Sequence, residues 1–227
     1  MTRAFVLGVT ATFIACMTPA RTPAAIDDPL ETCRAFARTS AANVLLAEAR
    51  AAMTAHFEGS DIAMADDRRI DPTITWPAAP AAVYVSLANG RLTRACVGSA
   101  APGGTLRATV RELAVQVLHS DRRRLPVRRE ELEGLRVVVS LAGPGTPVTD
   151  PMSVPLAREG LLVQSPLGSV AFLPGEARTV AYALREARRI GVLADAHDAS
   201  FERFKVIAIS EPPPRRAAAT PRAHDEP

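Results

Sequence analysis

The chain has 227 residues, of which 27 are lysine or arginine and 24 are aspartate or glutamate, so its formal net charge at pH 7 is only +3. A charge this small produces no strong electrostatic field, which argues against a nucleic-acid-binding protein. The length is sufficient for one domain with a hydrophobic core, together with additional segments at both ends.

The N-terminus has the pattern of an export signal. Arg3 supplies a positive charge, and the apolar run from Ala4 to Ala15 suits a signal-peptide core but is too short to span a membrane. The run ends at Cys16 in a sequence that resembles a bacterial lipobox, where the cysteine is lipidated and becomes the new N-terminus. We therefore predict a signal peptide over residues 1–15, lipidation at Cys16 and an exported protein anchored to a bacterial membrane.

Two other interpretations of this segment remain open. Ordinary cleavage near Ala20 or Ala25 would release an exported chain without a lipid anchor. A true start at Met17 or Met53 would remove the export signal altogether.

Two segments of biased composition flank the central part of the chain. Residues 16–29 suit a linker between an anchor and a domain, and residues 211–227 form a tail rich in proline, arginine and alanine. The tail has no hydrophobic periodicity and little to bury, so it is predicted to be disordered. The folded domain is therefore predicted to cover residues 30–210.

Patterns typical of helices and strands are interspersed along this domain. In chain order they predict a helix over 32–53, a hairpin of strands 83–87 and 91–97, a helix over 105–118, a short helix over 126–132, a strand over 135–141, a hairpin of strands 161–164 and 170–173, a helix over 180–190 and a strand over 201–209. Asn89-Gly90 is the sharpest local signal, because both residues accept positive φ in a tight turn. Without regular βαβ units, the fold class is α+β, with a mixed β-sheet flanked by helices.

Several short motifs within these elements occur in a recognisable order. They are Tyr84-Val85-Ser86-Leu87, Asn89-Gly90, Arg94-Ala95-Cys96-Val97-Gly98, Ser120-Asp121, Ser140 with Pro147, Gly160-Leu161-Leu162-Val163 and Phe172-Leu173-Pro174. Their order resembles that of the AMMECR-one domain family, and the resemblance covers roughly residues 30–210. In bacteria and archaea the family accompanies a MEMO-type protein and a radical-SAM enzyme, which implies an accessory or partner-binding role rather than a defined reaction.

The sequence departs from the family pattern at polar and turn-forming positions. Ala95 replaces a glycine, Thr93 is an extra residue, Arg122 and Arg124 replace proline and phenylalanine, Val138 replaces glutamate and Gly175 replaces glutamine. The resemblance therefore implies a divergent member in which the scaffold is kept and part of the site is altered.

One candidate catalytic group lies on the second predicted strand. Arg94 and Cys96 are two residues apart and are expected to share a face, where a guanidinium would favour the thiolate. With help from Asp121, Cys96 could then act as a nucleophile. The alternative is a buried, inert cysteine beside a surface arginine, and it is favoured because no histidine lies nearby in sequence to act as a base.

The oxidation state of the cysteines stays open at this stage. If Cys16 carries lipid, Cys33 and Cys96 are the remaining thiols. They could form a disulfide in an oxidising compartment, although a cysteine in this motif does not require a partner.

No metal or cofactor site is expected from the remaining polar residues. The four histidines, His56, His119, His197 and His224, are dispersed, and there is no phosphate-binding glycine loop or CxxC pair. The arginines between 122 and 129 are followed at once by glutamates and lack interleaved aromatic residues, so they are interpreted as a solvated face.

Two functions follow from these observations. The first is a membrane-tethered lipoprotein that acts as a binding module for an unknown protein or small ligand near Cys96. The second is a cysteine-dependent enzyme or modification factor that uses Cys96 with Arg94. Export would separate this domain from a cytosolic radical-SAM enzyme, and together with the altered motifs this favours the binding module.

Overall fold

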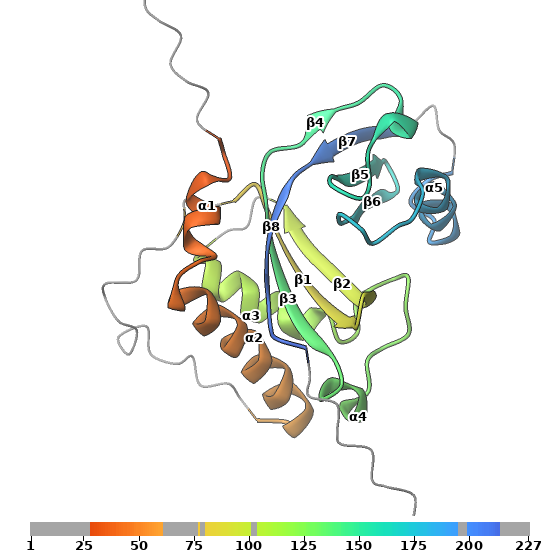
Figure 1. Ribbon diagram of the computed structural model, residues 1–227. Helices are drawn as coiled ribbons and strands as arrows, with labels where there is room; N and C mark the ends of the chain where they lie inside the picture. Colours follow the sequence, from red (N-terminus) through yellow and green to blue (C-terminus); the bar gives the residue numbers. More distant parts are fainter. Residues whose placement is uncertain (1–27, 61–76, 78–79, 101–103, 195–198, 214–227) are drawn as a thin grey trace, which may run out of the picture.

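A computed structural model of the chain describes residues 28–60, 77, 80–100, 104–194 and 199–213 (Figure 1). The predicted signal peptide, Cys16, nearly all of the predicted linker and most of the predicted tail lie outside these ranges. Across the described ranges, none of the helices is both long enough and apolar enough to cross a membrane.

The first predicted helix is in fact two helices. α1 spans Glu31–Phe36 and α2 spans Ser40–Glu58. The break lies at Thr39, which has an extended backbone and donates a hydrogen bond from its hydroxyl to the carbonyl of Phe36 at 2.8 Å. Apolar side chains keep their helical spacing across this break, so periodicity alone predicted one continuous helix.

Four strands form a first antiparallel sheet in the order β2-β1-β3-β8. They are β1 (Ala82–Asn89), β2 (Leu92–Ala100), β3 (Arg136–Ala142) and β8 (Val206–Ser210). The predicted hairpin between β1 and β2 is confirmed. Asn89 pairs with Leu92, and Gly90 has the positive φ of 59° that the turn requires.

A β-bulge interrupts β2. Leu87 pairs with Ala95, but the next residue, Ala88, pairs with Thr93, so Arg94 is left without a partner in the register. A bulge accommodates one extra residue in a strand and disturbs the alternation of its two faces. The bulge therefore accounts for the extra residue, relative to the family pattern, that the sequence analysis assigned to Thr93.

The other four strands form a second antiparallel sheet in the order β4-β7-β5-β6. They are β4 (Thr146–Pro147), β5 (Gly160–Ser165), β6 (Gly168–Phe172) and β7 (Ser200–Phe204). The predicted strand over 201–209 is divided at Lys205, where the chain passes from the second sheet to the first. The α+β class is confirmed, although the strands belong to two antiparallel sheets rather than one mixed sheet.

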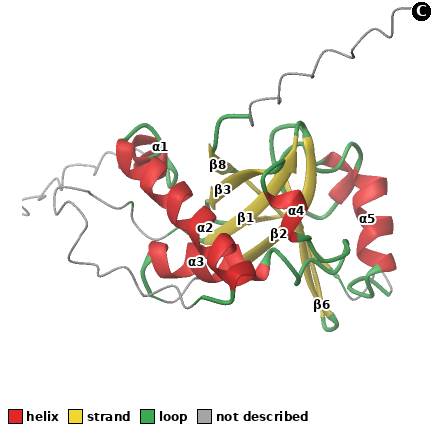
Figure 2. Ribbon diagram, turned by 90° about the horizontal axis from the view of Figure 1, so that it is seen from below, coloured by secondary structure: helices red, strands yellow, loops and turns green. Residues whose placement is uncertain are grey.

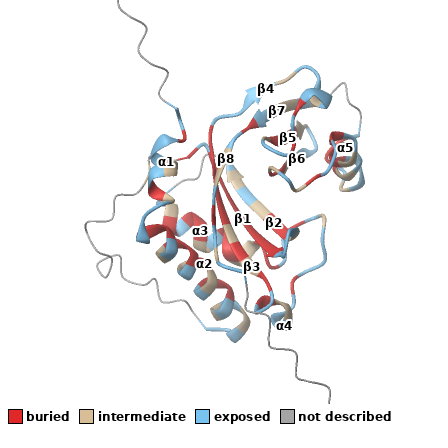
Figure 3. Cartoon of the chain, in the orientation of Figure 1, coloured by how far each residue is buried: buried red, intermediate tan, exposed pale blue. Residues whose placement is uncertain are grey.

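Each sheet buries its outer face beneath helices (Figures 1 and 3). α2 and α3 (Leu106–Gln116) cover the first sheet, in a core that includes Leu45, Val85 and Val139. α5 (Val180–Arg189) covers the second sheet, in a core that includes Phe172. Figure 2 shows these helices on opposite sides of the strands, so the two inner faces of the sheets lie toward each other.

Hydrogen-bonded caps define where the helices begin. Thr105 accepts a hydrogen bond from the N–H of Ala108 at 3.2 Å and is the predicted N-cap of α3. Thr179 caps α5 in the same way. α4 (Arg129–Leu132) is shorter than predicted, and a 3₁₀ helix, η2, spans Pro151–Ser153.

Candidate functional site

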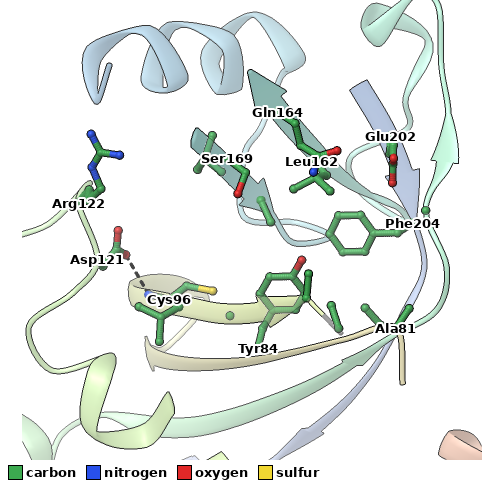
Figure 4. A pocket seen from close by; sticks show the side chains of 18 of the residues that line it. Ala81, Tyr84, Cys96, Asp121, Arg122, Leu162, Gln164, Ser169, Glu202 and Phe204 are labelled. Atoms are coloured by element: carbon green, nitrogen blue, oxygen red, sulfur yellow. Dashed lines mark hydrogen bonds between the residues drawn. The ribbon is translucent and has the colours of Figure 1, made fainter. Parts of the chain in front are cut away.

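A pocket with a volume of about 530 Å³ lies between the inner faces of the two sheets (Figure 4). Its walls come mainly from strands β1 and β2, from strands β5, β6 and β7, and from the loop that follows α3, with further residues from the end of β3 and the loop after it. The side chains that line it include Tyr84, Cys96, Ala100, Asp121, Arg122, Arg123, Leu162, Gln164, Ser169, Glu202 and Phe204. Apolar and polar groups are mixed, as is usual in small-molecule sites.

Two stacked aromatic rings connect the sheets at one end of the pocket. The centroids of Tyr84 and Phe204 are 5.8 Å apart, and the rings are inclined by only 12°. Each ring lies against a glycine on the neighbouring strand of its own sheet, since Tyr84 pairs with Gly98 and Phe204 pairs with Gly160. A Cβ on Gly98 would come within 2.1 Å of the Tyr84 ring, and a Cβ on Gly160 within 2.4 Å of the Phe204 ring. Both glycines of the sequence motifs therefore serve to make room for the aromatic pair.

The Cys96 thiol lies in the wall of the pocket but is only 7% exposed. Burial is the main cause that raises the pKa of this thiol to about 12, and the negative charge of Glu176 raises it further while Arg123 opposes the shift. The thiolate is the nucleophilic form of cysteine. At neutral pH Cys96 is therefore a neutral thiol and a poor nucleophile.

A buried ionic group lies beside Cys96. The Arg123 Nε atom is 3.0 Å from Asp121 Oδ1, and Arg123 Nη1 is 2.8 Å from Glu176 Oε1. None of the three side chains is more than 10% exposed. Burial acts to raise the pKa of Asp121, but the hydrogen bonds and charge of Arg123 outweigh it and the pKa is lowered. Burial raises the pKa of Glu176, against the influence of Arg123.

This ionic group holds the two sheets together at the side of the pocket. Asp121 accepts a hydrogen bond from the backbone N–H of Cys96 on β2, at 2.9 Å. Glu176 accepts one from the N–H of Leu173, just after β6, also at 2.9 Å. Arg123 lies between these carboxylates with its guanidinium 5.5 Å from the centre of the Phe172 ring. Asp121 is therefore a positioning residue that is already fully engaged, and not a free acid or base.

The expected interaction between Arg94 and the Cys96 thiol is not formed. Arg94 Nε donates a hydrogen bond to Glu131 at 2.8 Å, and its terminal nitrogens donate to the carbonyls of Leu125 and Pro126. The bulge at Arg94 removes the simple alternation on which the expectation depended, and Glu131 then captures the guanidinium. Arg123 is the arginine that influences the thiol.

Cys33 and Cys96 are both free thiols in the structure. Cys33 packs in the core between the helices and the first sheet, whereas Cys96 lies on the opposite, inner face of that sheet. Because the sheet separates them, the disulfide considered from the sequence does not form.

Sequence reasoning missed Arg123 and Glu176. Arg123 belongs to the arginine cluster that was interpreted as a solvated face, and yet its side chain is buried. One signal could have found it. The family motif Asp-Pro-Arg-Phe is kept here only at Asp121 and Arg123, and these two residues form the buried pair, whereas Arg122 and Arg124 are exposed. Glu176 offered no comparable local pattern.

The described part of the chain contains no group of three or more histidine, cysteine, aspartate or glutamate side chains that could hold a metal ion. His56 and His119 lie near each other, with ring centroids 5.8 Å apart. His197 and His224 fall outside the described ranges.

Two facing antiparallel sheets, covered by helices on the outside and separated by a pocket with a cysteine in its wall, define an AMMECR-type α+β domain. The AMMECR1 family model matches residues 46–209, and the chain belongs to the AMMECR1 family, as the order of its motifs predicted. The crystal structure of the uncharacterized protein PH0010 from Pyrococcus horikoshii is similar, with a TM-score of 0.54 and 22% sequence identity. The match covers 76% of this chain and 92% of that one and shows a common fold. No curated protein matches the chain.

Proposed function

We propose that this protein is a ligand-binding module that receives a small molecule, or a short segment of a partner protein, in the pocket between its sheets. The observation that carries the proposal is a set of pocket side chains without internal partners. Gln164, Ser169 and Glu202 line the pocket and form no side-chain hydrogen bond or ion pair within the described ranges. Binding pockets of roughly 300–1,000 Å³ commonly combine apolar walls with a few such polar groups.

An enzyme that uses Cys96 with Arg94 is the weaker candidate. Its nucleophile would have to ionise, but burial holds the pKa of Cys96 near 12. Its cationic partner would have to face the thiol, but Arg94 is bound to Glu131. Asp121 is engaged with Arg123 and cannot readily supply the missing base.

A thermal-shift screen of small molecules and short peptides against the full chain tests the binding function. Ligands that stabilise the wild-type protein should lose their effect when Ser169→Trp fills the pocket. Leu167→Trp is the matched control, because Leu167 is exposed in the same β5–β6 hairpin and does not line the pocket. A screen in which every stabilising ligand acts equally on both variants would contradict the proposal.

We also propose that the domain is tethered to a membrane through lipid on Cys16. The apolar run that ends at Ala15, directly before this cysteine, supports the tether. Cells fed radiolabelled palmitate should label the wild-type protein and not the Cys16→Ser variant. Absence of label from the wild type would refute the lipoprotein.

A further inference from the structure

Opposite charges lie at opposite ends of the pocket (Figure 4). Arg122 is at the end beside the β5–β6 turn, where its Nη2 atom donates a hydrogen bond to the carbonyl of Ile190 at 2.6 Å. Glu202 is half-buried on β7, at the end occupied by Phe204. Neither side chain forms an ion pair with any residue in the described ranges, so both charges are available to a ligand.

Strand register sets the separation of the two sheet positions that lie beside these charges. Glu202 pairs with Leu162 on β5, while a Cβ on Gly168 would lie 3.9 Å from Arg122 Nη1, and Gly168 pairs with Ser165. The three-residue offset from 162 to 165 corresponds to about 10 Å along β5, and the two strand spacings across it add about 10 Å in the perpendicular direction. The diagonal between the backbone positions of Glu202 and Gly168 is about 14 Å, which is the length of roughly four residues of extended chain.

The surface between the charges suits a peptide backbone. Gln164 and Ser169 pair across β5 and β6 and offer an amide and a hydroxyl to the pocket. An amide and a hydroxyl can together donate to a carbonyl and accept from an N–H. The opposite wall includes Ala82, Gly98 and Ala100, which are small residues and leave space for a ligand above this surface.

We propose that the pocket binds a peptide of three or four residues with both termini free, and this inference rests on the ligand-binding function proposed above. The ammonium group of the peptide pairs with Glu202, and its carboxylate pairs with Arg122. Charge-assisted hydrogen bonds of this kind are the stronger ones in recognition, and a guanidinium matches the shape of a carboxylate. A simple anion would use Arg122 alone, and a simple amine would use Glu202 alone.

Calorimetric titration of the full chain with tetra-alanine tests this assignment. We expect the Kd of the wild-type protein to rise about tenfold when the peptide is N-acetylated, and about tenfold when it is C-amidated. In Glu202→Gln the penalty for acetylation should disappear while the penalty for amidation remains. Arg122→Gln should show the reverse pattern.

Matched controls separate recognition of the termini from a change in overall charge. Glu130→Gln and Arg188→Gln remove the same charges at exposed positions that do not line the pocket, and both should keep the full penalties. Equal binding of free and capped peptides by the wild type, or no binding of tetra-alanine, would overturn the inference. If a non-peptide ligand then binds in a manner that Ser169→Trp blocks, the ligand-binding function stands and only the peptide assignment fails. If no pocket-dependent ligand exists, both fail.

Discussion

Asp121 accepts a hydrogen bond from the backbone N–H of Cys96 at 2.9 Å and does not act on the thiol as a base. The same carboxylate accepts from the backbone and the side chain of Arg123. Asp121 thus anchors the free edge of β2 to the loop after α3, on the side of the pocket. In the sequence, this acid and this cysteine suggest catalysis. In the fold, the carboxylate of Asp121 holds the backbone of Cys96 in place.

Removal of the Asp121 charge should destabilise the domain. Asp121→Asn leaves the buried Arg123 guanidinium with Glu176 as its one remaining carboxylate, so we expect the free energy of unfolding to fall by about 3 kcal/mol. Urea denaturation at pH 7 measures this loss. Asp150→Asn changes an exposed aspartate that caps η2 and should cost less than about 1 kcal/mol. Similar losses in the two variants would show that the buried ion pair contributes little.

Gly98 should not tolerate even one methyl group. In Gly98→Ala the new Cβ would lie 2.1 Å from the Tyr84 ring, so the ring must leave its present position in the stack with Phe204. We expect a loss of about 2 kcal/mol in the free energy of unfolding, typical of an overpacked site. Gly134→Ala is the matched control, because its nearest neighbour would be 3.6 Å away, and its effect should stay within about 0.5 kcal/mol.

Glu131 should contribute a stability that depends on pH. The hydrogen bond from Arg94 is the main cause that lowers the pKa of Glu131 from its usual 4.5 to about 2. Because the pKa in the folded state is the lower one, the stabilisation is complete above about pH 4.5 and is lost as the pH falls through about 2. Glu131→Gln should therefore cost about 1 kcal/mol at pH 7.

Denaturant titrations from pH 7 down to pH 3 should show this cost becoming smaller below pH 4.5. Glu130→Gln, at an exposed position in the same helix, is the control and should behave like the wild type throughout. A Glu131→Gln deficit that is constant over this range would mean that the ion pair with Arg94 is not its source.

Cys96 should react slowly with alkylating reagents. Its pKa of about 12, against the usual 9, lowers the thiolate fraction at neutral pH by about a thousandfold. Iodoacetamide labelling resolved by peptide mass spectrometry should therefore modify Cys96 far more slowly in the native chain than in urea. Labelling of native Cys96 within about tenfold of the unfolded rate would restore the cysteine-dependent enzyme as a serious candidate.

Local patterns predicted most of the secondary structure. Asn89-Gly90 identified the hairpin and Thr105 the start of α3, because both signals depend on a few neighbouring residues. The break at Thr39 and the passage between sheets at Lys205 were not predicted. In both cases the periodicity continues across the interruption, and only packing against distant residues shows that the chain changes direction.

The sequence by itself determined the fold class and the family, since the alternation of elements and the order of motifs are properties of the chain. The tertiary structure alone decided which polar residues meet. It placed Glu176 against Arg123 and turned Arg94 toward Glu131, and it put Glu202 at the far end of the pocket from Arg122. These contacts join segments that lie far apart in the sequence, and a buried charge is assigned its partner only when the two sheets come together.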